Sequence, residues 1–397
     1  PPTPEIYTYT ESSAASDVYK RQDKTFLITI GDRTITGLVN RDQMVGPWQV
    51  PVADCAVTAS TYEGYTGEAM AMGERTPLAA FDAPASGRMA VAEAITNIAA
   101  AAIDGIDKLR LSANWMAAAG HAGEDASLFD TVKTVANDMC RTLGIAIPVG
   151  KDSLSMRARW HQAGDEYQVV APVSLIVSAF APVSDATRQL TPQLQATNEQ
   201  SYLLLFDLGA RKNRLGGSCL AQAFNRVGGE APDIDDTAAL GHFFAAIQEL
   251  SSRDMLLAYH DRSDGGLLAT VAEMMFASRF GVSLQLSGSR ESMLAQLFSE
   301  EAGAVVQVTK GKLTQVQMVL DRHGIAAEAV GRVESKPVLT IRDGDATPLR
   351  FERKDLQRAW SETSYRIQAL RDNPATAREE YDRILDDDDP GLNAQLT

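Results

Sequence analysis

The chain has 397 residues, of which 45% are hydrophobic and 22% are charged, a composition typical of a globular protein with two or three domains. Its formal net charge of −15 argues against nucleic acid or an anionic membrane surface as the main partner, since both bind clustered lysine and arginine. The three cysteines are far apart and odd in number, which disfavours a disulfide framework and favours a reducing, cytoplasmic compartment. No apolar run is long enough for a membrane span, so we expect no membrane partner.

Residues 1–22 are set apart from the fold by their sequence. Residues 1–10 are rich in turn-forming residues, and residues 11–22 resemble the translation of a sequencing adaptor. We treat this leader as foreign to the fold, with a short disordered arm as the alternative. Under either interpretation the fold is expected to begin near Asp23.

The pattern of residues 23–190 predicts a first α/β domain that opens with a hairpin. Residues 24–30 (KTFLITI) are typical of a strand, followed by a turn signal and a returning strand at 34–39. A helix is predicted from the candidate N-cap Ser86 to Gly105, and its many alanines indicate close packing against another element. The other elements expected in this domain are strands at 55–60, 109–112, 145–149 and 167–180, and a helix at 125–143.

A domain boundary is expected in the polar stretch 182–200, which contains two prolines. Residues 200–335 alternate between predicted strands and helices, which indicates a second α/β domain. Its expected strands are at 202–208, 255–259, 304–308 and 329–333, and its helices at 218–225, 237–251, 267–276 and 312–323. Residues 336–397 are expected to form a little β structure, a polar helix at 354–371 and a solvated linker around the acidic run 386–389.

Four oxygen-bearing side chains indicate a magnesium site. Glu93 and Asn97 are four residues apart on the alanine-rich helix, so both lie on one face. Asp54 begins one predicted strand, and Asp261 follows another. Carboxylate and amide oxygens suit Mg²⁺, which often bridges to nucleotide phosphates, and small alanine neighbours would let a ligand approach. On chemistry alone, however, a Glu and an Asn on a helix are more often a solvated face.

Three segments that contain glycine are candidate phosphate sites. Gly150 follows a predicted strand and precedes a lysine, an aspartate and Ser153, although the spacing is not that of a Walker A loop. A structural glycine turn is the equal alternative there. Residues 216–217, a glycine pair before a predicted helix, suit an anion but are also a common turn. Residues 261–266 (DRSDGG) are dense in polar groups for a mere turn.

The sequence shows no apparent set of residues for nucleophilic catalysis. His260 beside Asp261 is the one histidine pairing that stands out, and a histidine near a strand end is more often structural than catalytic. None of Cys55, Cys140 and Cys219 lies in the sequence context of a glutaminase nucleophile.

Several of these segments carry a resemblance to a known family. They are residues 31–33 (GDR), 41–49 (RDQMVGPWQ), 67–70 (GEAM), 111–116 (LSANWM), 148–156 (PVGKDSLSM) and 259–266 (YHDRSDGG). They closely resemble the large, single-chain form of phosphoribosylformylglycinamidine synthase, from about Asp23 to the end of the chain. The resemblance implies an α/β (α+β) unit like aminoimidazole ribonucleotide synthetase, with a barrel-forming domain followed by an α/β sandwich domain. It corresponds to the second of two such copies in the full enzyme.

The resemblance also implies an activity and a set of site residues. The family uses ATP, Mg²⁺ and glutamine to convert formylglycinamide ribonucleotide to its amidine. The matching magnesium ligands are Asp54, Glu93, Asn97 and Asp261, and the matching nucleotide contacts are Ala53 and Ser263. Gly150 and Ser153 match ATP and substrate positions of the related small form, from which this chain departs at Lys151 and Asp152.

The family's catalytic histidine and its glutaminase domain are expected to lie outside this chain. We therefore expect no catalytic residue and no turnover in the isolated chain, with an auxiliary site for ADP or ATP. One alternative is a selenophosphate synthetase, thiamine-phosphate kinase or hydrogenase-maturation relative, whose Asp-rich N-terminal nucleotide loop is not found here. The other is a non-catalytic half that holds ADP and supports its partner copy.

Overall fold

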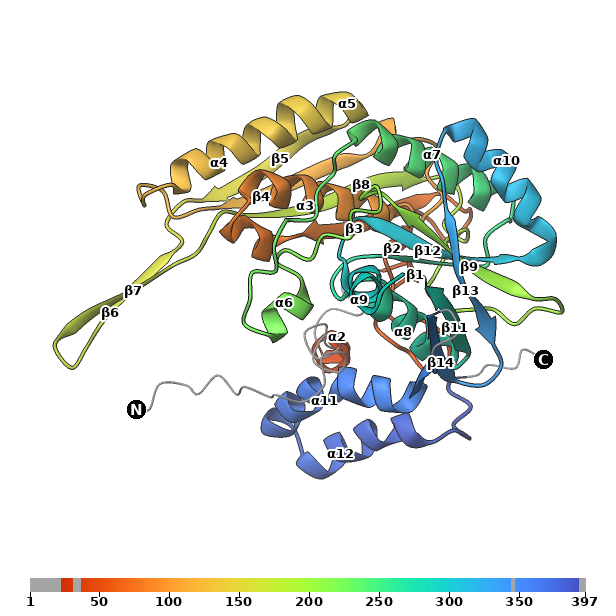
Figure 1. Cartoon of the computed structure of the whole chain (residues 1–397). Coiled ribbons are helices and arrows are strands. Elements are labelled where there is room, and N and C mark those ends of the chain that lie inside the picture. The colour runs from red at the N-terminus through yellow and green to blue at the C-terminus, as the bar shows by residue number, and fades with distance from the viewer. Residues whose placement is uncertain (1–22, 31–36, 287, 344–346, 393–397) are drawn as a thin grey trace.

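The computed structural model describes residues 23–30, 37–286, 288–343 and 347–392, which form two open mixed sheets with helices packed against them (Figure 1). This confirms the predicted α/β fold class. The first sheet has the order β1-β2-β3-β8-β4-β5, in which only β4 and β5 are parallel neighbours. Its strands are β1 (Val39–Arg41), β2 (Ala56–Ala59), β3 (Gly67–Glu74), β4 (Arg110–Met116), β5 (Ala146–Ser153) and β8 (Ser174–Val183).

Helices cover one face of this sheet (Figure 1). They are α3 (Ala83–Ile98), α4 (Glu124–Lys133), a π-helical turn (Thr134–Cys140) and α5 (Arg141–Leu143), with short 3₁₀ turns at Thr76–Ala80 and Ile106–Lys108. Helix α3 packs as closely as its alanines predict, because a Cβ on Gly73 of β3 would lie 2.2 Å from the Ala90 carbonyl oxygen. The helix begins earlier than predicted, since Asp82 rather than Ser86 is the N-cap, and it ends at Ile98 rather than near Gly105.

A two-stranded arm projects from the first domain (Figure 1). It consists of β6 (Arg157–Gln162) and β7 (Asp165–Val170), and Trp160 and Tyr167 stack across it with ring centroids 5.6 Å apart. The predicted single strand at 167–180 is therefore two strands, β7 and β8, separated by a break at residues 171–173.

The second sheet has the order β10-β12-β9-β13-β11-β14-β15, with β11 and β14 as its parallel pair. Its strands are β9 (Ser201–Asp207), β10 (Ala258–Asp261), β11 (Gly281–Leu286), β12 (Gly303–Thr309), β13 (Glu328–Glu334), β14 (Val338–Asp343) and β15 (Leu349–Glu352). The helices are α6 (Cys219–Ala223), α7 (Thr237–Ser252), α8 (Gly266–Ser278), α9 (Arg290–Phe298) and α10 (Leu313–His323), with a 3₁₀ turn at Lys310–Lys312. The sequence did not predict β11 or α9. All thirteen residues of α8 are buried, so this helix forms part of the core.

The two ends of the described chain pack together beside the second sheet. Helix α2 (Thr25–Ile30) packs on α11 (Arg353–Arg371), which is followed by α12 (Pro374–Asp382) and a 3₁₀ turn (Arg383–Leu385). The strand predicted at 24–30 is wrong, because Asp23 accepts a 2.8 Å bond from the Thr25 amide and Phe26 is buried. The returning strand at 34–39 lies mostly outside the described residues, and only Val39 belongs to a strand.

The segment after α12 contacts the body of the protein at Asp389 and Leu392, while residues 386–388 are exposed to solvent as predicted. Trp48 Nε1 donates a 2.9 Å bond to the Asp389 carbonyl, and the Leu392 amide donates a 2.7 Å bond to the Pro47 carbonyl. The Arg279 guanidinium bonds the same Asp389 carbonyl and lies 4.4 Å from the Trp48 ring centroid. In the part of the chain that is described, no helix has the length and apolar character needed to cross a membrane.

Candidate nucleotide and metal site

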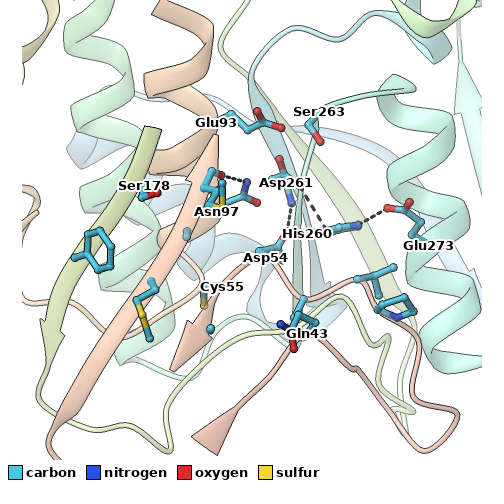
Figure 2. Close-up of a pocket in the computed structure, with 18 of the residues that line it drawn as sticks. Gln43, Asp54, Cys55, Glu93, Asn97, Ser178, His260, Asp261, Ser263 and Glu273 are labelled. Atoms are coloured by element: carbon cyan, nitrogen blue, oxygen red, sulfur yellow. Dashed lines mark hydrogen bonds and ion pairs between the residues drawn. The ribbon is translucent and has the colours of Figure 1, made fainter. Parts of the chain in front are cut away.

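A cavity of about 570 Å³ lies between the two domains, within the usual size range of small-molecule sites (Figure 2). The first sheet contributes residues from β2, β3 and β8 and from the loop before β2. Helix α3 supplies one wall, and β10, α8 and α11 supply the other side. The polar residues that line the cavity are Gln43, Asp54, Glu93, Asn97, Ser178, His260, Asp261, Ser263 and Glu273.

Asp54 lies at the centre of this cavity. Its Oδ1 accepts a 3.0 Å bond from the Asp261 amide and lies 2.7 Å from His260 Nδ1. Its Oδ2 is buried and has no hydrogen-bond partner among the described residues. A buried carboxylate oxygen without a partner is costly, so the arrangement is suited to a cation at this position.

His260 is bonded on both sides and holds Asp54 in place. Its Nε2 lies 2.8 Å from Glu273 Oε2, and the indole of Trp360 donates a 3.1 Å bond to the other oxygen of Glu273. Burial alone would lower the pKa of His260, but Asp54 and Glu273 outweigh it and raise the pKa to about 10. Both ring nitrogens are thus within hydrogen-bond distance of protein carboxylates, an arrangement that fits a structural role better than metal ligation.

Glu93 and Asn97 project from α3 toward the same space (Figure 2). Glu93 Oε2 accepts a 2.7 Å bond from the Glu74 amide, and Asn97 Nδ2 donates a 3.0 Å bond to the Met72 carbonyl. Burial, followed by the charges of Asp261 and Asp264, raises the pKa of Glu93 to about 8. Carboxylates held this close together repel one another, and a bound cation would relieve that repulsion. The arrangement therefore fits a cation site.

The candidate ligand atoms of Asp54, His260 and Asp261 lie within 4.8 Å of one another, and Glu93 is not part of that compact group. Since His260 is already bonded to two carboxylates, Asp54 and Asp261 are the candidate ligands for a divalent cation in this group. Glu93 and the Asn97 carbonyl would complete the ligand set from the other wall. The unpartnered Asp54 Oδ2 and the all-oxygen donors fit Mg²⁺.

The structure brings six of the eight predicted site residues to this cavity: Ala53, Asp54, Glu93, Asn97, Asp261 and Ser263. Gly150 and Ser153 lie elsewhere, on the exposed edge strand β5, which three strands separate from β2. A Cβ on Gly150 would lie 2.5 Å from the Ala113 carbonyl oxygen. The close approach of β4 is therefore enough to explain the glycine, without a bound phosphate. Gly150 also lies within a strand rather than in a loop after a buried strand, as the phosphate-loop interpretation required.

The glycine pair at 216–217 does not form an open anion site. The amides of Cys219 and Gly265 both donate 2.8 Å bonds to Glu300 Oε1, so a protein carboxylate already occupies these helix N-termini. The ligand atoms of Cys219, Asp264 and Glu300 also lie within 4.8 Å of one another. The buried guanidinium of Arg75 bonds Asp264 and Glu300, so an arginine rather than a metal supplies the positive charge there.

Sequence reasoning missed three residues that complete the cavity: Gln43, Glu273 and Trp360. Glu273 could have been found, because it is the only charged residue in the apolar segment 267–277 and a buried charge needs a partner. Trp360 lies nearly 90 residues further along the chain, and nothing in its local pattern connects it to the site. Cys55 also lines the cavity, where burial raises its pKa to about 12, so its thiol is neutral and is not an activated nucleophile.

Each of the two domains matches a known domain family. Residues 23–182 match the FGAR-AT PurM_N-like domain, and residues 203–344 match the C-terminal domain of AIR synthase related proteins. The chain thus contains both domains of an AIR-synthase-like unit.

Solved structures show the same fold. T. maritima PurL complexed with FGAR is 14% identical with a TM-score of 0.61, over 88% of this chain and 53% of that one. T. maritima PurL complexed with ADP is 12% identical with a TM-score of 0.59, over 88% and 51%. E. coli HypE, a hydrogenase maturation protein, is 20% identical with a TM-score of 0.50, over 73% and 86%. This chain spans about half the length of the PurL structures that it matches.

Proposed function

We propose that the cavity binds a magnesium–nucleotide complex and that the chain acts, within a longer ligase, in the ATP-dependent amidation of formylglycinamide ribonucleotide with glutamine as nitrogen donor. The observation that supports this most is the buried Asp54 Oδ2, which has no partner among the described residues and lies beside Asp261 in a cavity of nucleotide size. The apolar lining, which includes Val52, Met70 and Phe180, suits the base and ribose of a nucleotide.

The charge of the cavity determines how a nucleotide can enter it. Its described lining residues include the carboxyl groups of Asp54, Glu93, Asp261 and Glu273 and no lysine or arginine, and the imidazole of His260 is already bonded to Asp54 and Glu273. A nucleoside diphosphate without a metal ion would be repelled by this lining. Bound Mg²⁺ supplies the positive charge that neutralises the phosphates. Metal and nucleotide are therefore expected to bind together, with Asp54, Asp261, Glu93 and Asn97 as the metal-binding residues.

The comparisons supply the proposed substrate and the wider reaction. PurL from T. maritima has been solved with FGAR, with ATP and with ADP. Because this chain spans only about half of that protein, we assign the remaining machinery to other parts: a first synthetase half with the catalytic histidine, and a glutaminase domain that releases ammonia. In this account the cavity is an auxiliary site whose nucleotide, ADP, is retained rather than turned over.

Identification of the retained nucleotide tests this proposal. The chain is dialysed extensively with Mg²⁺, denatured, and the supernatant is assayed for nucleotide. Near-stoichiometric ADP is expected from the wild type, little from Asp54→Asn, and a wild-type amount from the surface control Asp104→Asn. Rapid ATP hydrolysis by the isolated chain, or full ADP retention by Asp54→Asn, would contradict an auxiliary metal–nucleotide site.

A second candidate is that the chain belongs to another AIR-synthase-like protein. The likeness to HypE supports this, since it covers 86% of that protein rather than half. Calorimetric titration with formylglycinamide ribonucleotide separates the two, after the chain has been combined with a synthetase half. Binding that requires both parts favours the amidation reaction, and the absence of binding favours the second candidate.

A further inference from the structure

The side chain of Gln43 is a polar group in the cavity that the metal site does not use. Gln43 lines the cavity, and its Oε1 is buried without a hydrogen-bond partner among the described residues. Buried acceptors are nearly always paired, and one left unpaired destabilises the fold. An acceptor of this kind at the wall of a ligand cavity indicates a donor on the ligand.

The backbone holds Gln43 firmly in position. Its carbonyl accepts a 3.2 Å bond from the Ala53 amide, next to the metal-binding Asp54. Between them the loop folds back on itself, because Val45 and Val50 exchange backbone bonds of 2.7 and 3.0 Å. The backbone at Gln43 is thus fixed relative to the metal site before any ligand binds, which limits where its side chain can reach.

The cavity has two chemically distinct ends (Figure 2). Glu93 and Ser263 lie at one end of the cavity, and Gln43 lies at the opposite end. Asp261 and Asp54 lie between the two ends. In the proposed complex the carboxylates hold Mg²⁺, and the phosphates of the nucleotide bind to that ion. The base of a nucleotide bound in this direction extends toward Gln43 and its apolar neighbours Pro51 and Val52.

We infer that Gln43 contacts the base of the bound nucleotide and selects adenine over guanine. This inference rests on the proposed metal–nucleotide site. A primary amide offers one acceptor and one donor, which match the 6-amino donor and the ring-nitrogen acceptor of adenine. On the edge formed by position 6 and N7, adenine presents a donor and an acceptor, whereas guanine presents two acceptors, O6 and N7. One of these would face Oε1 of Gln43 whichever way the amide is turned, and two acceptors repel each other.

Nucleotide titrations test the inference on the full 397-residue chain, stripped of metal and nucleotide by dialysis against EDTA. Mg·ADP and Mg·GDP are titrated separately by calorimetry into the wild type, Gln43→Leu and Gln43→Glu. The wild type is expected to bind Mg·ADP at least about 10-fold more tightly than Mg·GDP, the discrimination typical of one bidentate amide–adenine contact. Gln43→Leu keeps the side-chain size and is expected to abolish the preference, because it removes both the hydrogen bonds to adenine and the repulsion of guanine. Gln43→Glu keeps the acceptor and loses the donor, so an intermediate preference is expected.

Controls separate this inference from the proposed function. Gln317→Leu, on the exposed surface of α10, should behave as the wild type does. Wild-type protein that binds neither nucleotide would contradict the metal–nucleotide site itself. Wild-type protein that binds both equally, or a Gln43→Leu protein that keeps the preference, would overturn the role of Gln43 alone. If Gln43→Leu fails to fold, Gln43→Met replaces it in the same titrations, and a preference kept by Gln43→Met would likewise overturn the role of Gln43.

Discussion

His260 Nδ1 lies 2.7 Å from Asp54 Oδ1, and this contact joins the two domains at the floor of the cavity. Asp54 precedes β2 of the first sheet, and His260 lies in β10 of the second. On its other side His260 bonds Glu273, which in turn accepts a bond from Trp360 of α11. This chain of contacts leaves Asp54 Oδ2 without a hydrogen-bond partner among the described residues, so the domain interface and the proposed metal site depend on the same residues.

The first prediction concerns that histidine. His260→Leu removes the donor to two buried carboxylates, and breaking such a buried pair typically costs about 3–5 kcal/mol. We expect a loss of unfolding free energy of this size by urea denaturation, together with loss of retained ADP. His323→Gln, which alters a partly exposed histidine bonded to Glu249, should change stability by less than about 1 kcal/mol. A His260→Leu protein with wild-type stability would show that the contact is not structural.

A pH dependence is predicted for the ion pair between Asp207 and Arg262. Burial alone would raise the pKa of Asp207, but the Arg262 guanidinium and the Arg211 amide outweigh it and hold the pKa below the usual 3.8. A lowered carboxylate pKa stabilises the fold above pH 3.8, and this stabilisation is lost as pH falls through the lowered value. Asp207→Asn should therefore lower the unfolding free energy at pH 7 by about 3 kcal/mol and show a smaller further loss below pH 4. Thermal unfolding at pH 7 and pH 3, with Asp104→Asn as control, measures both. An unchanged acid slope in Asp207→Asn would contradict the assignment.

The third prediction concerns the acidic segment that follows α12. Arg279 bonds the carbonyls of Asp386 and Asp389 and lies over the Trp48 ring. Arg279→Ala removes both interactions and should release residues 386–392, with a loss of about 1–2 kcal/mol. Limited proteolysis followed by mass spectrometry should show faster cleavage in this segment. Arg253→Ala, which breaks an exposed helical pair with Glu249, is the matched control and should leave cleavage unchanged. Equal protection in Arg279→Ala would mean that other contacts hold the segment.

A fourth prediction separates the edge strand β5 from the nucleotide site. Gly150→Ala places a Cβ 2.5 Å from the Ala113 carbonyl oxygen, so β4 or β5 must shift, at a typical cost of about 1–3 kcal/mol. Since β5 lies outside the cavity, retained ADP should be unchanged. Gly241→Ala, in helix α7 with only an ordinary 3.5 Å contact, should instead be neutral or stabilising by up to about 1 kcal/mol. Loss of ADP from folded Gly150→Ala protein would place that glycine in the nucleotide site.

Much of the fold could be predicted because its elements have strong local signals. The alternation of apolar residues and the glycine stops placed most helices and strands of residues 200–335 within a few positions. The prediction of a strand at 24–30 was wrong because tertiary packing outweighs the β-rich composition of this segment. Asp23 accepts a bond from the Thr25 amide, Phe26 is buried, and the helix packs on α11.

The candidate site could be predicted from the sequence only in part. Glu93 and Asn97 could be paired from helical spacing, whereas Asp54 and Asp261 are about 200 residues apart and come together only through the packing of the two domains. The contribution of Trp360 and the docking of the acidic segment depend on contacts across more than 80 and 300 residues, respectively, which no local pattern encodes.

A calorimetric titration shows whether the cavity holds metal and nucleotide together. EDTA-stripped protein is titrated with ADP in the presence and in the absence of Mg²⁺, with wild type and Asp54→Asn compared at equal folded fraction. We expect binding by the wild type only with Mg²⁺, and an affinity at least about 10-fold weaker for Asp54→Asn. Binding of equal strength without Mg²⁺, or an Asp54→Asn protein with wild-type affinity, would contradict it.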